Sequence, residues 1–190
     1  MDYTDLVSLP NQKLRTRSKR VGIVTDATKR LIEDMQNATL SWEDSRKHEI
    51  GVALAAVQIG VMQRVVIVRS NFEDKSDRTF QVFINPTITK YEGAVLEDFE
   101  GCLSIKDVYG KVPRYNKVRI KALNIHGREV RITAEGFLAR VLQHEIDHTN
   151  GIVYIDHIKE NTQAFYTLNS EGSLEKLDYG KEIASNPILW

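Results

Sequence analysis

The sequence lacks the features that mark several broad classes of protein. It has one cysteine among its 190 residues, so no disulfide can form within the chain and a reducing compartment is expected. It contains no stretch of about 18 apolar residues, the length that a membrane-spanning helix requires. Its 26 basic and 26 acidic side chains cancel, so no bulk charge favours nucleic acid or an anionic membrane as a partner. We therefore expect neither sequence-specific nucleic-acid binding nor a membrane location.

The chain also lacks internal repeats, linkers and, over residues 1–5, the basic-then-apolar order of a signal peptide. Its length, with 42% apolar and 27% charged residues, is ordinary for one globular domain. We expect a single catalytic domain over residues 1–190, monomeric and cytoplasmic. Basic residues gather near the start, and we interpret them as a solvated arm rather than a nucleic-acid patch; they are Lys13, Arg15, Arg17, Lys19 and Arg20.

A first helix is predicted early in the chain, where Thr25 or Asp26 can act as the cap. Its apolar positions recur at helical spacing and are Ala27, Leu31, Ile32 and Met35. The polar stretch 41–49 that follows is either a surface loop or an extension of this helix.

A second helix is predicted over residues 134–150, with Thr133 as the cap and Gly151 as the stop. Apolar residues surround most of its cylinder, which is typical of a buried helix; they are Phe137, Leu138, Val141, Leu142 and Ile146.

Runs rich in β-branched and aromatic residues predict strands. They cover residues 65–68, 80–84, 88–96, 118–123 and 129–132, with the last two forming a hairpin around His126 and Gly127. A second hairpin is expected from residues 165–168 and 174–177. The pattern predicts an α+β fold in which antiparallel strands pack around a central buried helix, with an N-terminal helix and a C-terminal hairpin.

The strongest chemical signal is the H-E-x-x-H pentapeptide, residues 144–148, on the second helix. His144 and His148 lie about one turn apart on one helix face, so both imidazoles can reach one cation. Glu145 lies about a quarter turn away, where a carboxylate can hold a water and take its proton. The alternative is a pair of core histidines satisfied by hydrogen bonds. The apolar helix favours a metal, because two imidazoles and a carboxylate are costly to bury without a compensating partner.

A catalytic metal site of this kind needs a third protein ligand and an open position for water. Metalloproteases with an extended H-E-x-x-H-x-x-G-x-x-H motif take that ligand from the position at which this chain has Tyr154. Families with a downstream glutamate place it on a following helix, whereas Glu160, Glu171 and Glu175 fall in a predicted loop or hairpin. The remaining candidate is Cys102, because a thiolate can bind zinc or ferrous iron.

Three segments of the chain resemble motifs of the peptide deformylases, in the family's order and at compatible spacing. Residues 100–104 are similar to the E-G-C-L-S motif, residues 143–148 to Q-H-E-x-D-H, and residues 51–58 to G-x-G-L-A-A-x-Q. Segments 112–114 and 135–140 also resemble family segments. The resemblance covers the chain from about residue 5 to residue 158.

This resemblance implies a metal-dependent hydrolase that removes the formyl group from the N-terminus of nascent proteins. It implies Cys102, His144 and His148 as ligands of one divalent metal, ferrous iron natively with zinc, nickel or cobalt as substitutes. Glu145 would be the general acid and base. The implied partners are N-formylated nascent polypeptides, with the ribosome as a transient contact.

The resemblance also implies how the substrate is held. The side chain of Gln58 and the backbone N–H of Leu103 would stabilise the oxyanion formed from the formyl carbonyl. Backbone groups around Val52, Ala53 and Gly101 would pair with the extended peptide. The pocket for the first side chain would include Val52, Phe137 and Val141. Glu100 and Arg140 would form a supporting ion pair.

The chain departs from the family's pattern at two positions beside the expected substrate strand. Ala53 stands where glycine is more frequent and Val57 where proline is frequent, and we expect small geometric effects. The segment 41–50 is longer than usual and contains Trp42. We hypothesise that this segment shapes the entrance of the cleft.

Three other functions compete with this interpretation. A zinc endopeptidase or aminopeptidase shares H-E-x-x-H but leaves Gln58 and residues 100–104 without a role. A catalytically inactive binding module predicts the loss of Glu145 or of a ligand, and none is lost. A deformylase with shifted substrate preference is indicated only by Ala53 and Val57.

Overall fold

The computed structural model describes residues 2–47 and 49–190. Its long helices are α1 (Asp26–Asp44) and α2 (Gly136–Asn150). Its strands are β1 (Ala53–Ala55), β2 (Val65–Arg69), β3 (Phe80–Cys102), β4 (Ile105–Leu123), β5 (Glu129–Glu135), β6 (Phe165–Leu168) and β7 (Leu174–Lys176). Short helical turns are η1 (Tyr3–Asp5), η2 (Gln12–Arg15), η3 (Ala56–Ile59), η4 (Tyr154–His157) and η5 (Tyr179–Ile183).

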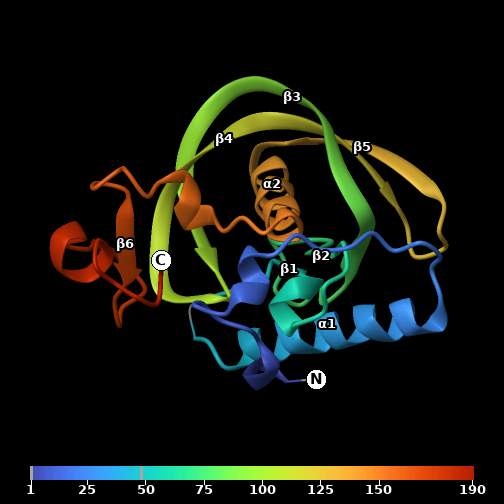
Figure 1. Cartoon of the computed structure of the whole chain (residues 1–190), viewed down its shortest axis with the longest axis horizontal. Helices are drawn as coiled ribbons and strands as arrows, with labels where there is room; N and C mark the ends of the chain where they lie inside the picture. The colour runs from blue at the N-terminus through green and yellow to red at the C-terminus, as the bar shows by residue number, and fades with distance from the viewer. Residues whose placement is uncertain (1, 48) are drawn as a thin grey trace.

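The strands form one antiparallel sheet in the order β1-β2-β3-β4-β6-β7, with β5 paired to β4. The arch of β3, β4 and β5 passes over one side of α2, while β1 and β2 lie on its other side (Figure 1). Helix α1 covers the far side of β1 and β2. The predicted α+β fold, with antiparallel strands around a central buried helix, is confirmed.

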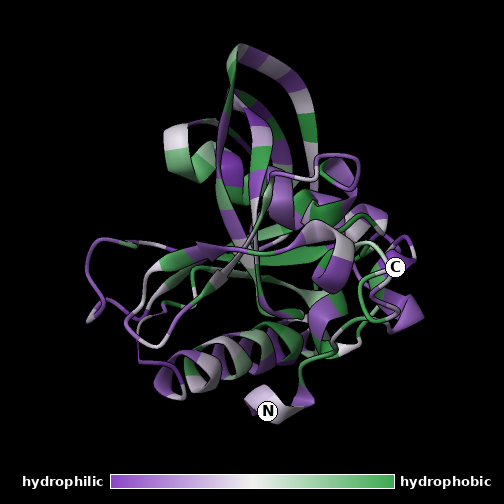
Figure 2. Ribbon diagram, turned by 90° about the vertical axis from the view of Figure 1, so that its left-hand side faces the viewer, coloured by the Kyte–Doolittle hydropathy of each residue, from purple (hydrophilic) through white to green (hydrophobic). Residues whose placement is uncertain are grey.

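The prediction of two separate strands within residues 80–96 was wrong, because β3 runs unbroken over 23 residues. Asn85 has a φ of 54° and is followed by Pro86, a pair that is typical of a loop. A register shift that spans this pair and three further shifts along the strand let the ladder with β4 continue. Much of β3 and β4 is solvent-exposed, and polar and apolar residues alternate along the arch (Figure 2). The first half of β4 was not predicted at all, because charged residues interrupt its apolar alternation.

Helix α2 begins two residues later than predicted. Thr133 and Ala134 belong to β5, where they pair with β4, and Glu135 is the residue that precedes the helix. Gly136 has a φ of 58°, a conformation that allows the sharp change from strand to helix. The predicted stop at Gly151 is confirmed, with a φ of 79°.

Helix α1 begins after Thr25, as predicted, and continues to Asp44, so the stretch 41–44 extends the helix. His48, farther along the segment 41–50, lies outside the described residues. Leu31, Ile32 and Met35 are buried against β1 and β2, and burying such side chains contributes about 1.5–3 kcal/mol each. Ala27 is exposed, however, and Thr28 takes its place on the buried face.

The two chain ends pack against the rest of the molecule. Leu14 is fully buried, and the Arg15 guanidinium lies 2.8 Å from a carboxylate oxygen of Asp156, so the basic segment is docked and is not a free arm. The C-terminal hairpin of β6 and β7 is confirmed, although β7 ends at Lys176. The Trp190 indole donates a hydrogen bond to the Ile183 carbonyl. None of the described helices has the length and apolar character needed to cross a membrane.

Candidate metal centre

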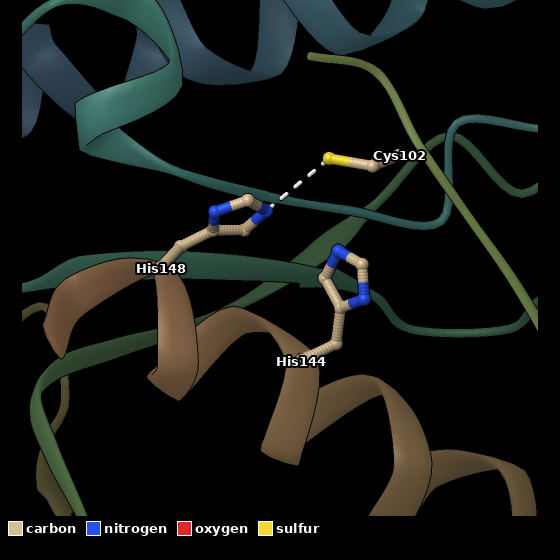
Figure 3. Close-up of side chains that lie close together, drawn as sticks. All are labelled: Cys102, His144 and His148. Carbon is tan, nitrogen blue, oxygen red and sulfur yellow. Dashed lines mark hydrogen bonds between the residues drawn. The ribbon is translucent and has the colours of Figure 1, made fainter. Parts of the chain in front are cut away.

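Helix α2 and the end of β3 bring three potential metal ligands together. His144 and His148 lie one turn apart on α2 and are buried, and Cys102 is the last residue of β3 (Figure 3). The Cys102 Sγ lies 3.3 Å from the His148 Nε2. One ligand atom from each of the three residues lies within 4.8 Å of the others. The three residues expected from the sequence to be metal ligands therefore lie close together.

The donor set and its surroundings fit a divalent metal. One thiolate and two imidazoles suit zinc or ferrous iron, and a tetrahedral centre places such atoms roughly 3.3 to 3.6 Å apart. The His144 Nδ1 lies 2.9 Å from a Glu100 oxygen, which leaves its Nε2 for a metal. The buried His148 Nδ1 has no hydrogen-bond partner among the described residues. These three residues could hold one metal ion.

A buried carboxylate, Glu100, organises the side of the centre behind His144. It pairs with Arg140 at 2.8 Å, as predicted, and with Arg114 through two hydrogen bonds of 2.9 and 3.1 Å. Burial opposes ionisation of Glu100, but hydrogen bonds from His144 and Arg114 hold its pKa below the ordinary value. Glu100 therefore remains a carboxylate that fixes the ring of His144.

The pairing of Arg114 on β4 with Asp147 on α2 was not predicted from the sequence. The Arg114 Nη1 lies 2.5 Å from an oxygen of Asp147, whose side chain also contacts His157 at 2.7 Å. His157 is about one-third exposed and completes this network. Arg114 could have been suspected from segment 112–114. The pairing of His157 with Asp147 depends on the turn η4 and has no signal in the sequence.

Gln58 directs its amide nitrogen at Cys102. The Nε2 lies 3.5 Å from the Cys102 Sγ and 3.3 Å from the Ser104 hydroxyl, and the Oε1 accepts a hydrogen bond from the Ala55 backbone at 2.8 Å. Because the Oε1 is held by the backbone, the orientation of the amide is fixed. Ser104, which is fully buried, was missed as a partner although it belongs to the E-G-C-L-S segment.

Glu145 is buried on α2 beside the histidines. Its Oε2 has no hydrogen-bond partner among the described residues. Burial raises the pKa of Glu145 to about 7, with nearby His144 opposing the change and Glu100 adding to it. A carboxylate with a pKa near neutrality and an unpartnered oxygen can both accept and return a proton.

A cavity of about 420 Å³ opens beside these groups. Every nominated site residue except His148 lines it: Val52, Ala53, Gln58, Gly101, Cys102, Leu103, Phe137, Val141, His144 and Glu145. Phe137 was expected on the buried face of α2 but is 47% exposed, with its ring edge-to-face on Phe72. A side chain at Gly101 would meet the ring of Tyr109, because a Cβ there would lie 2.6 Å from the Tyr109 Cε1.

The segment 41–50, hypothesised from the sequence to shape the entrance of the cleft, contributes lining residues to the same cavity. Trp42, Arg46, Glu49 and Ile50 are among its lining residues. The Tyr109 hydroxyl donates a hydrogen bond to the Glu49 carboxylate, which joins the segment to β4. The C-terminal hairpin also lines the cavity, which was not predicted from the sequence.

Comparison with known proteins agrees with this geometry. A family model described as polypeptide deformylase matches residues 3–164. The peptide deformylase of Thermomicrobium roseum is 37% identical over 174 residues, which is 90% of this chain and 94% of that protein. The peptide deformylase of Halothermothrix orenii is 43% identical over 145 residues, which is 76% of this chain and 86% of that protein.

Solved structures give the same result. The crystal structure of a peptide deformylase from Synechococcus elongatus in complex with actinonin matches with a TM-score of 0.71 and 34% identity, over 80% of this chain and 76% of that one. The peptide deformylase of Thermotoga maritima matches with a TM-score of 0.71 and 31% identity, over 80% of this chain and 95% of that one. On its sequence, its fold and its group of Cys102, His144 and His148, this chain belongs to the polypeptide deformylase family.

Proposed function

We propose that this protein hydrolyses the formyl amide at the N-terminus of newly made polypeptides and releases formate. The observation that carries the proposal is the meeting of a Cys-His-His group, the free carboxylate oxygen of Glu145 and the amide of Gln58 at one cavity. Membership of the polypeptide deformylase family supports it.

The proposed cofactor is one divalent metal held by Cys102, His144 and His148. Ferrous iron is the proposed native ion, with zinc, nickel or cobalt as substitutes, because a mixed thiolate and imidazole set accepts all of these ions. When bound, such a metal lowers the pKa of a water toward neutrality and so supplies a nucleophile at neutral pH.

Glu145 is proposed to move the proton. Its unpartnered Oε2 takes a proton from the attacking water and returns it to the amine nitrogen of the leaving peptide. Gln58 and the backbone N–H of Leu103 are proposed to donate hydrogen bonds to the oxygen of the formyl carbonyl as negative charge develops there. Fixed donors of this kind contribute roughly 10²–10³ in rate each, and the Ala55 backbone holds the amide of Gln58 in place.

The peptide is proposed to lie along the cavity as an extended strand. Backbone groups of Val52, Ala53 and Gly101 would pair with it, which is supported by the position of all three on the cavity wall. Val52, Phe137 and Val141 would form the apolar pocket for the first side chain, methionine. The half-exposed ring of Phe137 is available to a ligand, which supports this role.

We also propose that residues 1–190 act as a single, monomeric catalytic domain in the cytoplasm, with a transient contact to the ribosome. One continuous sheet from β1 to β7 supports a single domain. The lone cysteine supports a reducing compartment. Nascent formylated chains, the proposed substrates, are made on the ribosome.

The test is anaerobic purification with metal analysis, followed by assay of formyl-Met-Ala-Ser beside its unformylated and acetylated forms. Formate release from the formyl peptide alone is expected, and it should vanish in Glu145→Ala while the metal is retained. Full metal content in Cys102→Ala would overturn the ligand assignment. Cleavage between residues of the unformylated peptide would instead indicate a metallopeptidase, the alternative that leaves Gln58 without a role.

A further inference from the structure

The cavity beside the metal centre extends to the C-terminal hairpin. Its lining includes Leu168 at the end of β6, Gly172 in the connecting loop and Leu174 at the start of β7. The family match ends at residue 164, so the hairpin lies outside the segment that the family model covers. Neither the proposed hydrolysis nor the proposed pocket for the first side chain uses these residues.

The hairpin is a fixed wall, since it continues the sheet. Tyr166 pairs with Tyr109 of β4, and the next residue back, Phe165, pairs with Gly110 and is fully buried. The ring of Tyr166 lies edge-to-face on Phe99, with ring centroids 4.9 Å apart, and Phe99 itself lines the cavity. Backbone pairing and core packing thus hold the hairpin in one position, beside the end of the arch in Figure 1.

Two leucines give this wall an apolar surface. Leu168 and Leu174 are direct partners across the hairpin, so their side chains project from the same face. Leu174 is 36% exposed and Leu168 is half-buried, although both are large apolar residues. Exposed apolar side chains that line a cavity are typical of a ligand subsite.

The neighbouring part of the rim carries charges, but they are paired with one another. The Arg46 Nη1 lies 3.4 Å from a Glu49 oxygen and 3.6 Å from an Asp107 oxygen. Glu49 also accepts the hydrogen bond from Tyr109, the residue that pairs with β6. These charges neutralise each other. The surface that remains for a ligand at this end of the cavity is therefore the apolar surface of the two leucines of the hairpin.

We propose that Leu168 and Leu174 form a subsite for an apolar side chain of the formylated peptide, downstream of its first residue. The inference rests on the proposed function. A cavity of about 420 Å³ is in the range of pockets, about 300–1,000 Å³, that enclose ligands larger than one side chain. An extended peptide advances about 3.3 Å per residue, so its third and fourth residues lie farther along the cavity from the reacting formyl group.

The test compares kcat/KM for formyl-Met-Ala-Xaa-Ser and formyl-Met-Ala-Ser-Xaa, with leucine or serine at Xaa, and for formyl-Met-Ala. At one of the two positions, leucine is expected to raise kcat/KM of the wild-type protein about five- to tenfold over serine. The double variant Leu168→Ala/Leu174→Ala should reduce that ratio below about twofold and leave formyl-Met-Ala unaffected. Ile188→Ala is the matched control, because Ile188 is exposed near the C-terminus and is not a lining residue.

The outcomes distinguish failure of the proposed subsite from failure of the proposed function on which it rests. Equal rates for leucine and serine peptides in the wild-type protein overturn the subsite, and that comparison needs no variant. The subsite is also overturned if the double variant keeps the wild-type ratio of kcat/KM between leucine and serine peptides. The same holds if the double variant loses kcat/KM equally on every peptide, including formyl-Met-Ala. If formate release from formyl-Met-Ala persists in those cases, the proposed function stands. Absence of formate from every peptide overturns both.

Discussion

The Nδ1 of His144 lies 2.9 Å from a carboxylate oxygen of Glu100, which also pairs with two arginines. All of these side chains are at least nine-tenths buried. The carboxylate thereby fixes the plane of the imidazole and turns its Nε2 toward Cys102 and His148. A hydrogen-bonded carboxylate behind a histidine also raises the basicity of the ligand nitrogen, which strengthens the bond to a metal.

Glu100→Gln is expected to weaken metal binding about 10- to 100-fold, because the amide keeps the shape of the side chain but loses its charge. Competition for Co²⁺ with a chromophoric chelator measures this affinity. Glu92→Gln is the matched control, since Glu92 also lies on β3 and pairs with Arg119 at 2.6 Å, but on the surface. Equal affinity of both variants would contradict the supporting role of Glu100.

Gln58→Glu is expected to lower kcat on formyl-Met-Ala-Ser about 10²- to 10³-fold with little change in KM. The variant keeps an oxygen that can accept the hydrogen bond of the Ala55 backbone, but it lacks the amide donor that faces Cys102. Gln58→Leu removes both the donor and the acceptor without adding charge. Its kcat should fall by a similar factor. Metal content and thermal stability are measured for both variants. A loss of less than about fivefold in both would exclude Gln58 as an oxyanion donor.

The sequence predicted the centre of the site better than its surroundings. His144 and His148 are four residues apart on one helix, so local spacing alone indicates that both imidazoles can reach one cation. Cys102 lies far away in the chain, and it was nominated because other third ligands were lacking and because residues 100–104 resemble the E-G-C-L-S motif. Arg114 and His157 reach the site only because β4 and η4 fold against α2, a long-range arrangement that no local pattern encodes.

The fold was predictable in its elements but less so in their bounds. Burial of one face gave α1 its helical periodicity, and a polar turn between two strand-like runs indicated the C-terminal hairpin. Much of β3 and β4 is exposed, and charged residues interrupt the apolar alternation over the first half of β4, so that half was not recognised. The hairpin's contact with the cavity depends on pairing between Tyr109 and Tyr166, which are distant in sequence.

Metal removal is expected to lower the midpoint of thermal unfolding, because a ligand that binds only the folded state stabilises it. At a free concentration of 1,000 times Kd, the stabilisation is about 4 kcal/mol. Unfolding is followed by circular dichroism after treatment with a chelator and again after addition of Zn²⁺ or Co²⁺. Cys102→Ala should show a much smaller metal-dependent shift. A full shift in that variant would mean that the ion binds elsewhere.

Glu43→Gln is expected to lower the free energy of unfolding by about 3 kcal/mol, because it leaves the buried Arg69 guanidinium without a counter-charge. The Glu43 carboxylate also accepts a hydrogen bond from the Gly51 backbone at 3.0 Å, so it ties the end of α1 to the segment before β1. Asp44→Asn is the matched control: Asp44 pairs with Arg78 at 2.8 Å on the surface, and losing that pair should cost under about 1 kcal/mol. Urea unfolding of the three proteins measures the difference. Equal free energies of unfolding of the two variants would show that the buried Glu43–Arg69 pair stabilises the fold no more than the exposed Asp44–Arg78 pair.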